Sequence, residues 1–143
     1  MASSASIAFA TVLEYVESGD NTGIGELTNI GGIGLTADTI EVTSHDSTSR
    51  FREFLQGIRD GGEFSVEGNH VPGDAGQAAG YTHFTGDGDG GGLEAMIITF
   101  PDASNWTFNA IVTSYQAGDA PFDGKLGFSA TFKISGVPAF ATS

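Results

Sequence analysis

The stretch KLGFSATFKIS, residues 125–135, alternates between apolar and polar side chains along its length. A side-chain period of two is that of a β-strand with one face buried and the other exposed. The sequence therefore predicts a strand here. The side chains expected to face the core are Leu126, Phe128, Ala130, Phe132 and Ile134.

Similar patterns recur elsewhere in the chain. WTFNAIVTSYQ (106–116) alternates, with Trp106 on the face expected to be buried. LEAMIITF (93–100) is more uniformly apolar, as a strand buried on both faces would be. Residues 8–16 are a further, less regular candidate. The turn sequences PDASN (101–105) and GDAPFDG (118–124) separate neighbouring strands.

Two further strands are expected to present acidic side chains to solvent. In DTIEVTS (38–44), Ile40 and Val42 are expected to point inward and Glu41 outward. In GEFSVEGNHV (62–71), the apolar Phe64 and Val66 alternate with acidic residues. The outward acidic residues of that stretch are Glu63 and Glu67.

The 143 residues suffice for a single domain, residues 1–143. Several short strands without a βαβ rhythm predict a mainly β fold, an antiparallel β-sandwich or barrel. Asp74 and Gln77 have the spacing of a capping box and predict one short flanking α-helix from Ala75 to about Phe84, although Gly80 weakens that prediction.

The segment from 46 to 61 has a different pattern. Its apolar residues fall at i, i+3, i+4 and i+7, which predicts a long, partly helical loop. It also holds three of the five Lys and Arg residues of the chain. The apolar residues are Phe51, Phe54, Leu55 and Ile58, and the basic ones are Arg50, Arg52 and Arg59.

The composition limits the possible partners. A net charge of −13 disfavours tight binding of nucleic acid, which needs Lys and Arg to displace counterions from the phosphates. The chain has no cysteine, so disulfides and thiolate metal sites are excluded. The N-terminal residues do not resemble a signal peptide, and no apolar run approaches the length of a membrane span. We therefore expect a soluble protein, made in the cytoplasm, with no membrane partner.

Catalytic and cofactor motifs are incomplete. The Gly/Asp-rich loop at 85–92 has Asp87 and Asp89 at calcium-loop spacing, but Gly91 and Ile98 occupy later ligand positions. The glycines before Lys125 have the wrong spacing for a phosphate loop, and GIGLTA (32–37) leads into an extended run, not a helix. The three histidines have no i, i+4 partner. We expect no cofactor, no metal and no enzymatic activity.

An ordered series of motifs resembles the tail tube (major tail) proteins of long-tailed bacteriophages. The most distinctive part is the succession TSHDS, REF, DGGE, EGN and PGD between Thr43 and Asp74. ITFPDASNWTFNAIVTSYQ and GFSATFKISGVP extend it, so that it covers residues 24–138. The 85–92 loop is richer in Gly and Asp than the family pattern, and we expect no appended immunoglobulin-like domain of the kind that some family members carry.

The resemblance implies a structural virion protein. Six copies would form a ring, and rings would stack into a hollow tube that encloses a tape-measure protein, meets terminator and tip proteins, and conducts DNA without binding it. The protein would be located in the virion tail, and in the host cytoplasm before assembly. Alternatives are a β-sandwich binding module for capsid decoration or carbohydrate, and the tube protein of a contractile injection system.

In that setting the 46–61 segment would be an arm that contacts a neighbouring subunit or ring. The expected interface residues are Arg50, Phe51, Arg52, Phe54, Leu55, Ile58 and Arg59. The alternative is that the same apolar stripe caps its own sandwich. The candidates for side chains that face the lumen, where negative charge would repel DNA, are Glu41, Glu63 and Glu67.

Overall fold

The computed structural model describes residues 10–17, 20–46, 49–85, 93–122 and 124–142. In these residues the elements are β1 (Val12–Glu17), β2 (Asp20–Gly23), β3 (Leu27–Ile30), β4 (Thr36–Glu41), β5 (Phe54–Asp60), β6 (Glu63–Asn69), α1 (Ala75–Thr85), β7 (Glu94–Thr99), β8 (Asn105–Asp119) and β9 (Gly127–Ala141). The expected mainly β fold with one short helix is confirmed.

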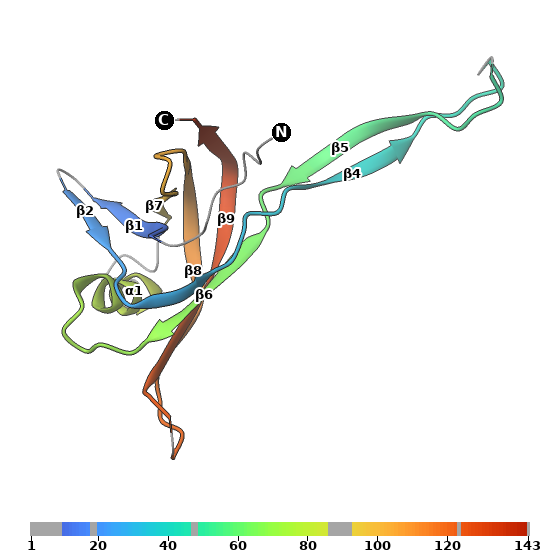
Figure 1. The fold of residues 1–143 in the computed structure, drawn as a ribbon. Coiled ribbons are helices and arrows are strands. Elements are labelled where there is room, and N and C mark those ends of the chain that lie inside the picture. Colours follow the sequence, from blue (N-terminus) through green and yellow to red (C-terminus); the bar gives the residue numbers. More distant parts are fainter. Residues whose placement is uncertain (1–9, 18–19, 47–48, 86–92, 123, 143) are drawn as a thin grey trace, which may run out of the picture.

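Seven strands form one antiparallel sheet in the order β2-β1-β7-β8-β9-β6-β3, and β4 and β5 form a separate pair. The large sheet curls over its core in a sandwich-like way without closing into a barrel, and β2 and β3 remain its edges (Figure 1). The buried apolar side chains are Leu13, Tyr15, Ile24, Phe64, Val66, Met96, Ile98, Phe108, Ala110, Phe128, Ala130, Phe132 and Ile134.

Alternate side chains of β6 and β9 point into this core. Phe64 pairs with Phe132 across the two strands, and their rings stack with centroids 5.2 Å apart. Val66 pairs with Ala130 in the same row of buried residues. The strand prediction for 125–135 is confirmed for its buried face, but Leu126 lies before β9 and is exposed.

The helix α1 begins as the sequence indicates. Asp74 Oδ2 accepts a hydrogen bond from the backbone N–H of Gln77 at 3.0 Å, which caps the helix N-terminus. Gly80 is not a defect in this helix, because a Cβ there would lie close to the ring of Tyr115 and the hydroxyl oxygen of Tyr15. The glycine therefore lets α1 approach the sheet closely.

One strand expectation needs correction, and two strands have no counterpart in the sequence predictions. β7 is buried on one face only, because Ala95 is exposed between buried and half-buried neighbours. In β8 the face expected to be buried is confirmed, and Trp106 packs half-buried at the rim of the core, where its ring lies 5.1 Å from that of Phe140. β2 and β3 carry no apolar alternation, so the sequence pattern does not predict them. They form strands because they pair with β1 and β6, respectively.

Candidate functional site: the arm and the polar sheet face

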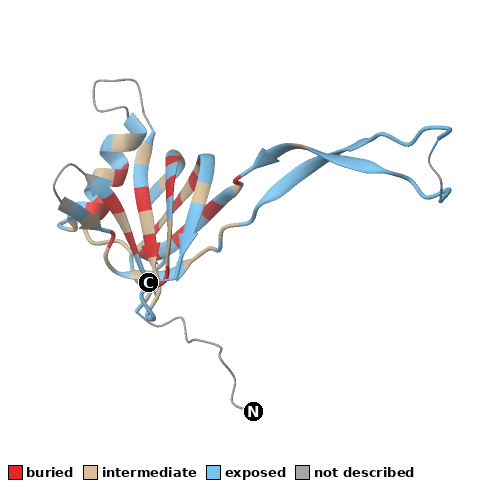
Figure 2. Cartoon of the chain, turned by 90° about the horizontal axis from the view of Figure 1, so that it is seen from above, coloured by how far each residue is buried: buried red, intermediate tan, exposed pale blue. Residues whose placement is uncertain are grey.

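The pair β4–β5 is a hairpin that projects away from the body of the molecule (Figure 1). Figure 2 shows it exposed along its length, while the buried residues gather in the body. We call residues 36–60 the arm. It is longer than the expected 46–61 segment, and the expectation of a helical arm is wrong, because Phe54–Asp60 is a strand.

The strand replaces the helix for a local reason. An isolated helix of two turns is marginal in water, and Gly57 and the β-branched Ile58 lower helix propensity further. The preceding strand β4 supplies backbone partners for residues 54–60. A bulge in β5 between Gln56 and Arg59 also interrupts the period of two by which a strand is recognised in a sequence.

The register distributes the apolar side chains over both faces of the arm. Ile40 pairs with Leu55 and therefore shares a face with it, while Glu41 and Phe54 pair on the opposite face. The expectation that Ile40 and Val42 point into the core is wrong, because 54% and 40% of their surfaces are exposed. Both faces of the arm thus carry uncovered apolar surface.

The expected interface residues lie on or next to this hairpin. Phe51 is 76% exposed, Phe54 52%, Leu55 58% and Ile58 82%. The alternative in which this stripe caps its own sandwich is therefore wrong. The basic residues Arg50, Arg52 and Arg59 are also exposed, and Arg59 Nε donates a hydrogen bond to Gln56 Oε1 at 3.0 Å.

The arm is fixed to the body at its root. Lys133 Nζ on β9 donates to Asp60 Oδ1 at 2.8 Å, and the N–H of Gly62 donates to the same oxygen at 2.7 Å. These hydrogen bonds lower the pKa of Asp60, with that from Lys133 the larger cause. Gly62 has a φ of 79°, and a Cβ there would overlap the carbonyl oxygen of Gly34. The root therefore requires glycine.

The outer face of β6, β9 and β8 carries mainly polar side chains. They stand in three cross-strand rows, which are Glu63–Lys133–Ile111, Ser65–Thr131–Ser114 and Glu67–Ser129–Gln116. We call these nine residues the polar face. The structure thus brings Glu63 and Glu67 onto one surface, as expected, but Glu41 lies on the arm.

The helix α1 is held against the sheet from several sides. The buried Gln77 side chain accepts from the N–H of Val71 and donates to the carbonyls of Gly25 and Asn69. Tyr115 on β8 donates to the carbonyl of Gln77 at 2.9 Å, and burial raises the pKa of this tyrosine. Sequence reasoning missed this network, because nothing in the local pattern marks Gln77 as buried.

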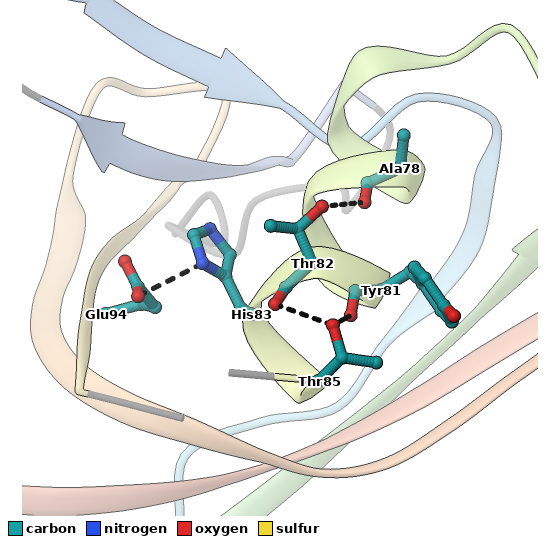
Figure 3. Close-up of polar contacts among 6 residues, drawn as sticks. All are labelled: Ala78, Tyr81, Thr82, His83, Thr85 and Glu94. Atoms are coloured by element: carbon teal, nitrogen blue, oxygen red, sulfur yellow. Dashed lines mark hydrogen bonds and ion pairs between the residues drawn. The ribbon is translucent and has the colours of Figure 1, made fainter. Parts of the chain in front are cut away.

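The last turn of α1 also contacts β7. His83 Nδ1 lies 3.0 Å from Glu94 Oε1, and Thr85 donates to the carbonyls of Tyr81 and Thr82 (Figure 3). No group of three or more His, Cys, Asp or Glu side chains suited to a metal occurs in the described residues. The calcium-like positions Asp87, Asp89 and Gly91 lie outside the described residues.

Within the residues that the structure covers, no helix is long and apolar enough to cross a membrane. The model of the family described as lambda phage tail tube protein matches residues 8–141. The chain belongs to this family. None of the curated proteins compared with the chain matches it.

Solved structures share the fold at low sequence identity. A chain in the tail of an empty gene transfer agent particle, refined with C6 symmetry, has a TM-score of 0.76 and 21% identity, with 96% of this chain and 99% of that chain covered. A chain in the structure of the sheath/tube terminator of an extracellular contractile injection system (PVC) has a TM-score of 0.73 and 12% identity, with 99% of each chain covered. The SPP1 tail tube gives 0.66 and 15%, covering 93% and 76%.

Proposed function

We propose that this protein is a structural, non-catalytic subunit of a hollow phage tail tube. Six copies form a ring, and rings stack into a tube through which DNA passes. The observation that carries this proposal is the arm, whose apolar side chains are uncovered in the single chain. Because the chain belongs to the tail tube family, we infer that a further copy of the same chain covers this surface.

The arm contacts an adjoining subunit through Phe51, Phe54, Leu55 and Ile58. Each such side chain contributes about 1.5–3 kcal/mol when it is fully removed from water. The arginines of the arm, Arg50, Arg52 and Arg59, meet carboxylates of the acidic neighbour. Exposed pairs of this kind stabilise little, but they set register and orientation.

The polar face lines the lumen. Glu63 and Glu67 repel DNA phosphates over a Debye length, about 8 Å at physiological salt, and so allow the DNA to slide. Lys133 on this face is engaged by Asp60, which limits its attraction for phosphate. Glu41 belongs to the arm contact instead, because it pairs with Phe54.

A hollow tube of this kind has further protein partners in its lumen and at its two ends. During assembly the lumen encloses a tape-measure protein, and terminator and tip proteins meet the two ends of the tube. The protein is located in the virion tail after assembly and in the host cytoplasm before it. A chain in a PVC sheath/tube terminator has the same fold, so the tube and its end proteins can share one contact geometry.

Negative-stain microscopy of concentrated protein tests the proposal. The native chain is expected to form hollow filaments, and the double variant Phe54→Ser, Leu55→Asp is expected to remain monomeric with an unchanged thermal melt. The matched control is Phe84→Ser, Leu93→Asp, since these side chains are similarly exposed but lie outside the arm. Native protein that stays monomeric at every concentration would refute the proposal.

The structure does not favour the carbohydrate-binding alternative. Such a module needs an exposed aromatic platform, and the large aromatic side chains of β8, Trp106 and Tyr115, do not supply one. Tyr115 is engaged beneath α1 by the carbonyl of Gln77, and Trp106 is half-buried.

A further inference from the structure

A groove opens at the end of the sheet where β1 begins, β7 ends and β9 ends. Its volume is about 1260 Å³, and residues 23–33, from the end of β2 through β3, form its second wall. Its larger apolar lining residues include Ile30, Ile33, Ile98, Phe100, Trp106 and Phe140. Phe140 is 51% exposed, so the groove presents aromatic surface to solvent.

The charged side chains that line the groove are both acidic. They are Glu26, which accepts a hydrogen bond from Asn69 Nδ2 at 3.1 Å, and Asp102. Asp102 accepts hydrogen bonds from the hydroxyl and the N–H of Ser104, which lower its pKa. The groove is thus an apolar slot flanked by two carboxylates, and it suits an apolar side chain with cations beside it.

The tip of the arm has this composition. Arg50-Phe51-Arg52 places a phenylalanine that is 76% exposed between two exposed arginines. Residues 49–59 hold three arginines and one glutamate, so their formal charge is +2. The rest of the chain holds 5 − 3 = 2 basic and 18 − 1 = 17 acidic residues. No other part of the chain concentrates positive charge in this way.

The arm tip of one molecule is far from its own groove. About ten residues of extended hairpin span roughly 33 Å, whereas a compact domain of about 100 residues has a radius of gyration of about 13 Å. The arm leaves the body and points outward from it (Figure 1). A tip that enters this groove therefore comes from another molecule.

We propose that the groove binds the arm tip of a second copy of this chain. Phe51 enters the slot against Trp106 and Phe140, and Arg50 and Arg52 lie beside Glu26 and Asp102. The inference rests on the proposed tube function and names the receptor for its arm. Tip and groove are different surfaces, so the contact leaves a free tip and a free groove on every pair and propagates into a ring or a stack.

Engineered cysteines test the contact, because the native chain has none. Ser49→Cys on the tip and Asn29→Cys in the groove wall are placed in separate proteins, mixed, assembled and oxidised. We expect a disulfide between residues 49 and 29 of different molecules. The matched control is Ser65→Cys on the polar face, also exposed, which is expected to stay unlinked to residue 49.

Charge reversal gives a second readout. Asp102→Arg is expected to raise the concentration needed for assembly by roughly tenfold or more, and Arg50→Asp with Arg52→Asp in the same chain is expected to restore part of the loss. Phe51→Ala is expected to raise that concentration about thirtyfold, as loss of a central anchor does. The thermal melt of each unassembled variant shows whether it still folds.

The outcomes separate this inference from the tube function. Hollow filaments without a 49–29 disulfide, or with an equal 49–65 disulfide, overturn the groove contact and leave the tube intact. A disulfide from residue 29 to a cysteine at Ser3 of the same molecule assigns the groove to the chain's own N-terminal residues, and also overturns it. Absence of any assembly by the native chain overturns both proposals.

Discussion

Lys133 Nζ lies 2.8 Å from Asp60 Oδ1, so the last residue of β5 is tied to the middle of β9. The N–H of Gly62 donates to the same carboxylate, and the carbonyl of Gly62 accepts from the N–H of Ile134 at 3.0 Å. The direction of the arm is therefore set by a few contacts at its root.

The Asp60 carboxyl should titrate below its ordinary value of 3.8, because Lys133 and the N–H of Gly62 hold its charged form. A carboxyl whose pKa is lowered by folding stabilises the native state above its unfolded value. That contribution is lost as the pH falls through the lower, folded pKa. NMR titration of the carboxyl carbon measures the midpoint, and Lys133→Met is expected to move it up toward 3.8. An equal midpoint in both proteins would show that the pair is not formed in solution.

Gly62→Ala should destabilise the chain by about 1–3 kcal/mol, because alanine is strained at positive φ and its Cβ would overlap the carbonyl of Gly34. Urea unfolding measures the loss. Gly73→Ala is the control, since a Cβ at Gly73 meets nothing within 4 Å and its φ is not positive. Equal effects of the two substitutions would show that the root of the arm does not require glycine at position 62.

Gln77→Ala should cost about 2–4 kcal/mol, because it leaves the N–H of Val71 and the carbonyls of Gly25 and Asn69 without this partner. Chemical unfolding followed by circular dichroism gives the free energy. Thr82→Ala is the comparison on the exposed side of α1 and should change stability by less than about 0.5 kcal/mol. A neutral Gln77→Ala would mean that the network does not hold α1 in place.

Glu63→Lys with Glu67→Lys should slow DNA release from assembled particles, if the polar face lines the lumen. New phosphate contacts bind DNA through counterion release, so the delay should shrink as salt is raised. Time-resolved release of DNA in vitro measures the effect. Glu63→Gln with Glu67→Gln, which removes the charge without reversing it, should release DNA faster than the lysine variant. Unchanged release from the lysine particles would exclude these residues from the lumen.

The site could be predicted only in part from the sequence. The concentration of arginines and apolar residues between Arg50 and Arg59 identified an unusual segment, but its i, i+3, i+4 and i+7 spacing suggested a helix. A bulge in β5 interrupts the alternation of a strand there, and a bulge depends on the register with β4, which no local pattern encodes. For the same reason the local alternation predicts Ile40 in the core, whereas it is exposed on the arm.

The sequence by itself determined the alternating strands, the capped helix and the acidity, because side-chain period, capping and charge are properties of neighbouring residues. Phe128, Ala130 and Phe132 face the core as their spacing requires. Only the tertiary structure decided that β4 and β5 leave the body as a hairpin, that Glu63 and Glu67 share a face without Glu41, and that a groove stays open beside Trp106. These features depend on which strands that are distant in the chain pair with each other and which surfaces they leave uncovered. Such contacts between distant residues are determined by the whole fold.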